Sequence, residues 1–312
     1  MLPSLRPGPH RIEAAPLQLD QAKQGTLDEV LGAYAAELRR HPDQETAAVT
    51  LGYTHSLHRP WRTALRMLPV PPGGSILDVG CGLGILSFEL AANLPLTVHG
   101  VDIEPDFVVH AEELRRRLDE RRFFADGATL RFSEGDIHAL AVPDDNIDLL
   151  FVRELLQFLP DPLAAVRELF RVVRPGGYAC VSDTDDQLHI TWPPPSAAQE
   201  RLVGAVTSLQ HERGGDRHTG RKLSTYLRQA GFEIASVVVL PEAQHRVVDA
   251  NDVERALILE QLRAARGRVV DAGTMAGPDF DAHLAELAAE TPHEEFRMNA
   301  RIIVLGRKPS SD

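Results

Sequence analysis

The sequence has 312 residues, enough to bury a large hydrophobic core, and its 43% hydrophobic and 25% charged residues are ordinary for a globular protein. The formal net charge of -12 indicates an acidic surface that repels phosphate backbones, which argues against a nucleic-acid partner. No stretch approaches the roughly 18 apolar residues that span a membrane, and two isolated cysteines exclude a disulfide framework, so we expect a cytoplasmic protein without a membrane partner.

Two helices are predicted ahead of the first strand. Apolar residues recur at helical spacing over residues 27–40, which indicates an amphipathic helix. After a polar connection, residues 59–68 form a second candidate that ends before the Pro-Pro-Gly-Gly break at 71–74. By sequence alone these helices could serve as packing or dimerisation elements.

A glycine-rich loop follows the first predicted strand. Residues 75–79 form an apolar run that leads into Gly80, Gly82 and Gly84, and a helix is expected over 85–93. Glycines at such a strand-to-helix turn let a ligand approach backbone N–H groups closely. The spacing differs from the G-x-G-x-x-G of nicotinamide enzymes. Asp78 at the strand end would repel a pyrophosphate and favours a cationic, amine-bearing cofactor instead.

Strands and helices alternate through the rest of the chain, which predicts a mostly parallel sheet covered on both faces. Asp102 ends the second strand, where a carboxylate can accept both hydrogen bonds of a ribose diol. The remaining strands are expected over residues 129–132, 146–152, 178–183, 232–240 and 300–306.

The run L-D-V-G-C-G-L-G at residues 77–84 resembles motif I of the class I S-adenosylmethionine-dependent methyltransferases of small molecules. The Arg-Pro-Gly-Gly turn at 174–177 matches the same family, and the resemblance covers about 75–240 and resumes at 300–308. It implies an α/β, Rossmann-like fold with seven strands in the order 3-2-1-4-5-7-6. The last strand would be antiparallel, with helices on both faces and added N-terminal and C-terminal cap helices.

The resemblance also implies a division of the chain. Residues 1–70 would form a lead-in and cap helices, 71–245 the methyltransferase core, 246–298 a helical insertion that caps the substrate, and 299–312 the last core strand and tail.

The implied cofactor is S-adenosylmethionine, with S-adenosylhomocysteine as its product. By position, Asp136 matches the family residue that accepts from the adenine amino group, and Ile137 the apolar residue against the ring. The full set of expected cofactor contacts is Asp78, Gly80, Cys81, Gly82, Gly84, Asp102, Ile103, Asp136, Ile137, Val152 and Arg153.

The implied reaction is direct in-line displacement, which mainly requires alignment, exclusion of water and, for a weakly acidic acceptor, a base. Candidate bases are His189, His211 and His218, and candidate substrate contacts are Tyr53, Gln157, Phe158 and Trp192. Phe158 stands where the family often has a histidine, so no base is transferred to that position. We expect no metal site, because Asp183, Asp185 and Asp186 read as a solvated acidic loop.

We therefore expect methyl transfer to a small-molecule metabolite, secondary metabolites included, by a monomer or homodimer. The acceptor atom stays open among oxygen, nitrogen and carbon. Two alternatives also stay open: an enzyme that retains the cofactor for cyclisation or rearrangement, and a non-catalytic, cofactor-binding regulatory subunit.

Overall fold

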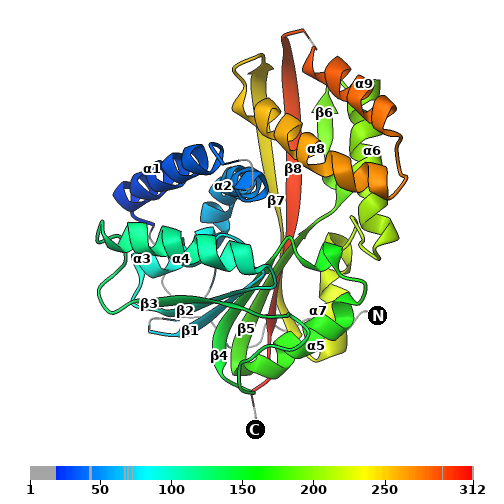
Figure 1. Ribbon diagram of the computed structural model, residues 1–312. Coiled ribbons are helices and arrows are strands. Elements are labelled where there is room, and N and C mark those ends of the chain that lie inside the picture. The colour runs from blue at the N-terminus through cyan, green and yellow to red at the C-terminus, as the bar shows by residue number, and fades with distance from the viewer. Residues whose placement is uncertain are drawn as a thin grey trace.

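The computed structural model describes residues 19–310 except 42–43, 67, 69, 72 and 290, and it leaves out the side chains of 45–46, 53, 56–60 and 63. One mixed sheet forms the centre of the molecule, with helices on both faces (Figure 1). A second group of helices stands above the sheet on a long pair of strands.

The sheet confirms the predicted class I methyltransferase order. The parallel strands are β1 (Ser75–Val79), β2 (Thr97–Asp102), β3 (Thr129–Glu134), β4 (Ile147–Arg153) and β5 (Val173–Thr184). They lie in the order β3-β2-β1-β4-β5, and the antiparallel β8 (His293–Arg307) follows β5 with β7 (Glu233–Val248) on its other side. A short strand that the sequence did not predict, β6 (Ile190–Trp192), pairs with the far end of β8.

Strands β7 and β8 are much longer than predicted. They pair from Glu233 and Arg307 at one end to Val248 and His293 at the other, whereas β5 reaches only as far as Arg301 on β8. The extra length projects beyond the sheet as a two-stranded ribbon (Figure 1). Pro241 lies within β7, which is an edge strand among the described residues, where a missing N–H is tolerated.

The N-terminal helices differ from the prediction in extent. α1 spans Gln21–Leu38 and is capped by the side chain of Asp20, and α2 spans Glu45–Leu65. The expected connection before residue 59 was wrong, because Ala47, Ala48 and Leu51 on α2 are buried in one apolar cluster with α1. Small and polar residues on the rest of α2 hid that pattern.

Helices cover the two faces of the sheet separately. α3 (Ile85–Asn93) and α4 (Pro105–Asp119) lie on one face with α1 and α2, and α5 (Pro162–Val172) and α7 (Leu223–Ala230) lie on the other (Figure 1). Within the part of the chain that the structure describes, none of the helices has the length and hydropathy to cross a bilayer.

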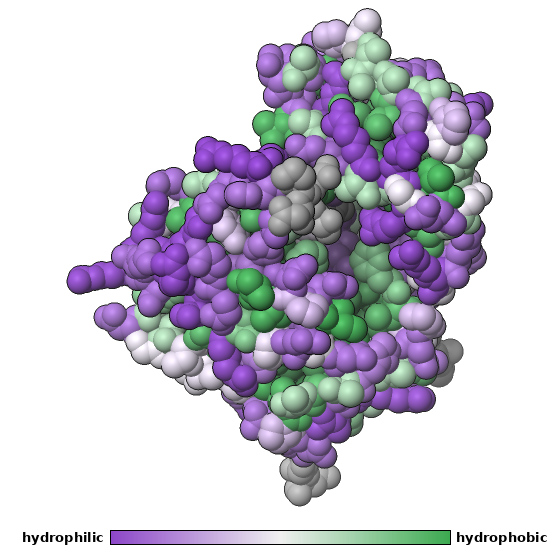
Figure 2. All heavy atoms as spheres, in the orientation of Figure 1, coloured by the Kyte–Doolittle hydropathy of each residue, from purple (hydrophilic) through white to green (hydrophobic). Residues whose placement is uncertain are grey.

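The helical cap contains three helices, α6 (Ala197–Glu212), α8 (Val253–Asp271) and α9 (Gly277–Ala288). Their shared apolar cluster includes Leu202, Leu262, Val269 and Phe280. The cap thus includes α6, which lies within residues 71–245, the segment expected to form the methyltransferase core. A recess separates the cap from the helices on the other side of the molecule, at the ends of the parallel strands (Figure 2).

Candidate functional site

The glycine loop between β1 and α3 has the backbone that the sequence predicts. Gly80, Gly82 and Gly84 have φ values of 69°, 53° and 82°, all in the left-handed region that favours glycine. A Cβ on Gly80 would lie 2.7 Å from the Leu155 side chain, and one on Gly84 2.5 Å from Phe132. A Cβ on Gly82 would meet nothing within 4 Å among the described residues. The loop is therefore packed at its two ends and open at Gly82, where a ligand can reach the backbone.

Asp102 braces this loop from the end of β2. Its Oδ2 accepts a hydrogen bond from the Gly82 N–H at 2.7 Å, and its Oδ1 accepts one from the Glu104 N–H at 3.0 Å. The neighbouring Ile103 leaves 59% of its surface exposed. A carboxylate with remaining lone pairs beside an exposed aliphatic side chain suits a ribose diol and the base attached to it.

The segment after β3 contributes one polar and one apolar residue. Asp136 is exposed and accepts from both the backbone N–H and the Nδ1 of His138, contacts that lower the pKa of the carboxyl. Ile137 is only 6% exposed and packs into the core beneath β1 and β4. Of the expected adenine contacts, Asp136 therefore presents its side chain outward and Ile137 mainly supports the sheet.

A buried polar group underlies the loop on the α3 side. Asp78 accepts a hydrogen bond from the Ser87 hydroxyl at 2.8 Å, and burial raises the pKa of its carboxyl against the opposing charge of Arg153. The Arg153 guanidinium lies 5.2 Å from the centre of the Trp61 ring. Burial lowers the pKa of Arg153, opposed by Asp78 and Glu154. The Ser87 hydroxyl and the charge of Arg153 compensate the buried Asp78 carboxylate, which orients the glycine loop.

Two other predicted contacts are buried beneath the loop. Val152 is fully buried at the end of β4, and Cys81 is 3% exposed. Burial, followed by the charges of Asp78 and Asp102, raises the pKa of the Cys81 thiol well above its usual value. The thiol therefore stays neutral, and the backbone N–H of Cys81 donates to the Val101 carbonyl at 3.1 Å.

A second polar cluster lies beside the loop at the ends of β4 and β5. Glu154 follows β4, and its Oε1 lies 3.0 Å from Nε of Arg301 on β8. Gln157 donates from its backbone N–H to Oδ2 of Asp183 at 2.9 Å and from its side-chain amide to Oε2 of Glu154 at 3.3 Å. Arg217 donates to Oε1 of Gln157 at 2.9 Å. Gln157 thus connects the carboxyl groups of Glu154 and Asp183.

Comparison with known proteins identifies the domain that contains the glycine loop. Residues 77–181, which run from β1 through the glycine loop to β5, match a family model described as a methyltransferase domain. This part of the chain is a methyltransferase domain.

Two curated relatives and one solved structure define the similarity. The chain is 37% identical over 114 residues to the 2-methyl-6-phytyl-1,4-hydroquinone methyltransferase of Synechocystis, covering 36% of this chain and 33% of that protein. It is 31% identical over 177 residues to the 27-O-demethylrifamycin SV methyltransferase of Amycolatopsis mediterranei, covering 54% of this chain and 57% of that protein. The YcgJ protein of Bacillus subtilis shares the fold, with a TM-score of 0.51, 15% identity, and coverage of 81% of this chain and 100% of that one.

The matched region is therefore the methyltransferase domain alone. The chain spans one third of the first relative and little more than half of the second. The N-terminal helices and all three cap helices, α6, α8 and α9, lie outside the family match at 77–181.

The histidines proposed as bases of the methyltransferase domain lie in different places. His211 is exposed at the end of α6, and His218 is partly exposed, with its backbone N–H donating to Asp216 at 2.8 Å. His189 precedes β6, where partial burial and the charges of Arg301, Arg217 and Arg297 lower the pKa of its imidazole against Asp186. The imidazole of His189 therefore interacts with two arginines of the polar cluster, Arg301 and Arg217.

The residues proposed as substrate contacts also lie in different parts of the molecule. Gln157 is 2% exposed and belongs to the polar cluster, whereas Phe158 is 52% exposed beside it. Trp192 lies on β6 with 71% of its surface exposed. The side chain of Tyr53 lies outside the described residues, so its contact stays a prediction.

Sequence reasoning missed Glu154, Arg217 and Arg301 and treated Asp183 as a solvated loop residue. Asp183 is instead fully buried as the penultimate residue of β5. A position directly after a parallel strand was the available signal for Glu154. Arg301 comes from a distant segment and reaches the site only because β8 inserts beside β5.

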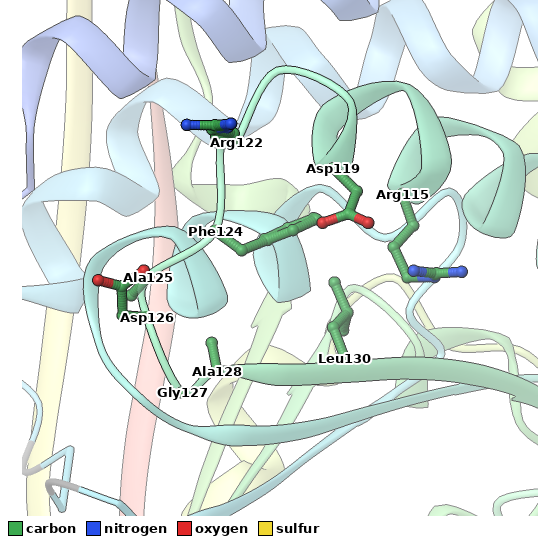
Figure 3. A pocket seen from close by; sticks show the side chains of 9 residues that line it. All are labelled: Arg115, Asp119, Arg122, Phe124, Ala125, Asp126, Gly127, Ala128 and Leu130. Carbon is green, nitrogen blue, oxygen red and sulfur yellow. The ribbon is translucent and has the colours of Figure 1, made fainter.

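The described residues contain no group of three or more histidine, cysteine, aspartate or glutamate side chains placed to hold a metal ion. An open depression of about 520 Å³ lies at the start of β3 and the end of α4 and is lined by Arg115, Asp119, Arg122, Phe124, Ala125, Asp126, Gly127, Ala128 and Leu130 (Figure 3). The glycine loop lies at the opposite ends of the parallel strands, so this depression is separate from the methyltransferase site.

Proposed function

We propose that this protein transfers a methyl group from S-adenosylmethionine to a small-molecule metabolite by direct in-line displacement. The observation that carries the proposal is the open backbone at Gly82, braced by Asp102, in a chain whose matched domain is a methyltransferase. When bound, the sulfonium cofactor supplies an already activated methyl group. The protein then has to align the acceptor and exclude water.

Supporting features for the acceptor pocket lie on the part of β7 and β8 that belongs to the sheet. Arg301 on β8 is directly opposite Leu240 on β7, and Leu240 also lines an apolar groove with Ala64 of α2. The groove residues are Ala64, Leu68, Ser236, Val238, Leu240, Ile303 and Leu305. A polar group and an apolar surface meet at this position, which favours an acceptor with a reactive polar group on an apolar body. Both curated relatives carry names of such acceptors, a phytyl hydroquinone and a rifamycin.

Two measurements test the proposal. Titration calorimetry should detect binding of S-adenosylhomocysteine to the full chain. Methyl-labelled S-adenosylmethionine should then label at least one compound in a panel of hydroquinones, phenols, primary amines and hydroxylated macrocycles, analysed by mass spectrometry. Absence of binding would refute the cofactor, and binding without any labelled product would favour the regulatory alternative.

Replacing Asp102 should weaken cofactor binding. The Asp102 carboxylate accepts hydrogen bonds from the backbone N–H groups of Gly82 and Glu104. In Asp102→Asn the amide N–H₂ faces one of these donors, so that hydrogen bond is lost. The charge-assisted hydrogen bond to the ribose is lost as well. We expect affinity for S-adenosylhomocysteine to fall by about 1–3 kcal/mol in calorimetry. Asp106→Asn, an exposed residue early in α4, is the control and should bind normally. Equal affinities in the two variants would remove Asp102 from the site.

A further inference from the structure

Glu154 has a backbone conformation that few side chains adopt. Its φ is 52°, in the left-handed region, which costs a non-glycine residue on the order of 1–3 kcal/mol unless the surroundings hold it. Its N–H donates to the Ser182 carbonyl at 2.9 Å, and the next residue, Leu155, packs against Gly80. The strained residue is therefore fixed between β5 and the cofactor loop, at the ends of the parallel strands.

The carboxyl group of Glu154 is held from several elements but keeps accepting capacity. It faces Arg301 from β8, Arg217 from the segment before α7, Arg153 from β4 and Gln157 after β4. Its Oε1 is buried and receives no well-aligned hydrogen bond from the described residues, although the Arg301 guanidinium is 3.0 Å away. A buried acceptor atom whose neighbouring donor is poorly aligned keeps the capacity to accept a hydrogen bond from a ligand.

Asp183 differs from Glu154 because both its oxygens are occupied. Oδ2 accepts from the N–H of Gln157 and Oδ1 from the N–H of Thr184, each at 2.9 Å. Burial, with the adjacent charge of Glu154, raises the pKa of Asp183 to about 8. Burial also raises the pKa of Glu154, against Arg301, Arg217 and Arg153. The two neighbouring carboxyls therefore titrate as a coupled pair, and Glu154 is the member that the guanidinium groups of Arg301, Arg217 and Arg153 face.

We propose that Glu154 is the catalytic base on the acceptor side and that Asp183 is a positioning residue for it. The Glu154 carboxylate takes the proton from the nucleophilic atom of the acceptor while a lone pair of that atom forms the bond to the methyl carbon. The carbon–sulfur bond breaks with its electron pair remaining on sulfur, and Glu154 afterwards releases the proton to water. This inference rests on the proposed methyl transfer.

The proposal restricts the acceptor class. A base is useful only where the attacking atom carries a hydrogen that it must lose, as in a hydroxyl group or a primary or secondary amine. The charge of Glu154 is balanced by Arg301 and that of Asp186 by Arg217, at 3.0 Å and 2.7 Å. The pocket therefore favours an acceptor that is neutral overall at its reactive end.

The test compares Glu154→Gln with Asp148→Asn. The glutamine keeps the size and backbone cost of residue 154 and removes its basicity. Asp148 is a half-buried carboxylate at the opposite end of the same strand, paired with Arg174, and is the matched control. Using any panel compound that the wild-type chain methylates, we expect Glu154→Gln to lower kcat about a hundredfold with little change in KM and unchanged S-adenosylhomocysteine affinity. Asp148→Asn should behave as wild type.

The pH profile provides the second readout. The wild-type rate should fall as the pH is lowered and the carboxyl pair takes up a proton, and the Glu154→Gln rate should lose that dependence. Wild-type kcat and an unchanged profile in Glu154→Gln would overturn the role of Glu154 while leaving methyl transfer intact. Cofactor binding without methylation of any panel compound would instead overturn the proposed function, and this inference with it.

Discussion

Gly82→Val should abolish cofactor binding while leaving the fold in place. The new side chain would project into the open space at Gly82, which no described atom occupies within 4 Å, and would block the approach to the backbone. We expect affinity for S-adenosylhomocysteine to fall more than a hundredfold in calorimetry, which is about 3 kcal/mol. The free energy of unfolding should fall only by the cost of a left-handed valine, on the order of 1–3 kcal/mol.

Gly73→Val supplies the matched control for this experiment. Gly73 also has a left-handed φ of 72° and no described atom within 4 Å of its missing Cβ, but it precedes β1 instead of following it. The two variants should lose similar stability in denaturant unfolding, and only Gly82→Val should lose the cofactor. Comparable cofactor affinity in both variants would contradict the assignment of the loop.

The buried carboxyl of Asp183 should make the protein less stable as the pH rises. Its pKa is raised from 3.8 to about 8 in the folded state, so the folded state binds more protons than the unfolded state between these values. Stability linked to this group is complete below pH 3.8 and is lost progressively up to pH 8. Between pH 5 and pH 8 the loss is on the order of 4 kcal/mol.

Asp183→Asn should remove this dependence. The asparagine amide cannot ionise, so its contribution to stability does not depend on pH. Its N–H₂ group faces a backbone N–H donor, so the variant has a lower free energy of unfolding than the wild type at pH 5. Denaturant unfolding of both proteins should show that penalty shrinking, or reversing, by pH 8. Asp148→Asn should show a constant penalty over the same range, because hydrogen bonds from Ser75 and Arg174 outweigh burial and keep the pKa of Asp148 below its usual value. A constant penalty for Asp183→Asn would show that Asp183 is ionised throughout.

The first strand, the glycine loop and the helix after it were predictable from sequence because their geometry is local. Glycine spacing determines where the backbone turns, and the apolar run before it determines which residues are buried, so β1, the loop and α3 follow from about 20 consecutive residues. The strand order was predictable only through the family resemblance. Asp102 lies at a strand end, a position that sequence patterns identify well.

The polar cluster beside the loop was not predictable because its residues converge from distant segments. Glu154 and Asp183 meet through the pairing of β4 with β5, and Arg301 reaches them only because β8 inserts beside β5. The ribbon escaped prediction because its outer part is stabilised by ion pairs and not by an apolar pattern. Arg246, for example, contacts Glu295 at 3.0 Å and Asp252 at 3.1 Å. Such charged residues resemble a solvated loop when read in sequence.

The ribbon separates the central sheet, which carries the glycine loop, from the outer module formed by α8, α9 and the ends of β7 and β8. Beyond Arg301 the pairing of β8 with β5 has ended, so the outer halves of β7 and β8, together with α8 and α9, contribute nothing to the register of the central sheet. On the proposed function, changes in that part alter the wall facing the acceptor without moving the segments that carry Gly82 and Asp102. Substitutions in the outer ribbon, α8 and α9 should then change which acceptor is methylated while affinity for S-adenosylhomocysteine stays the same.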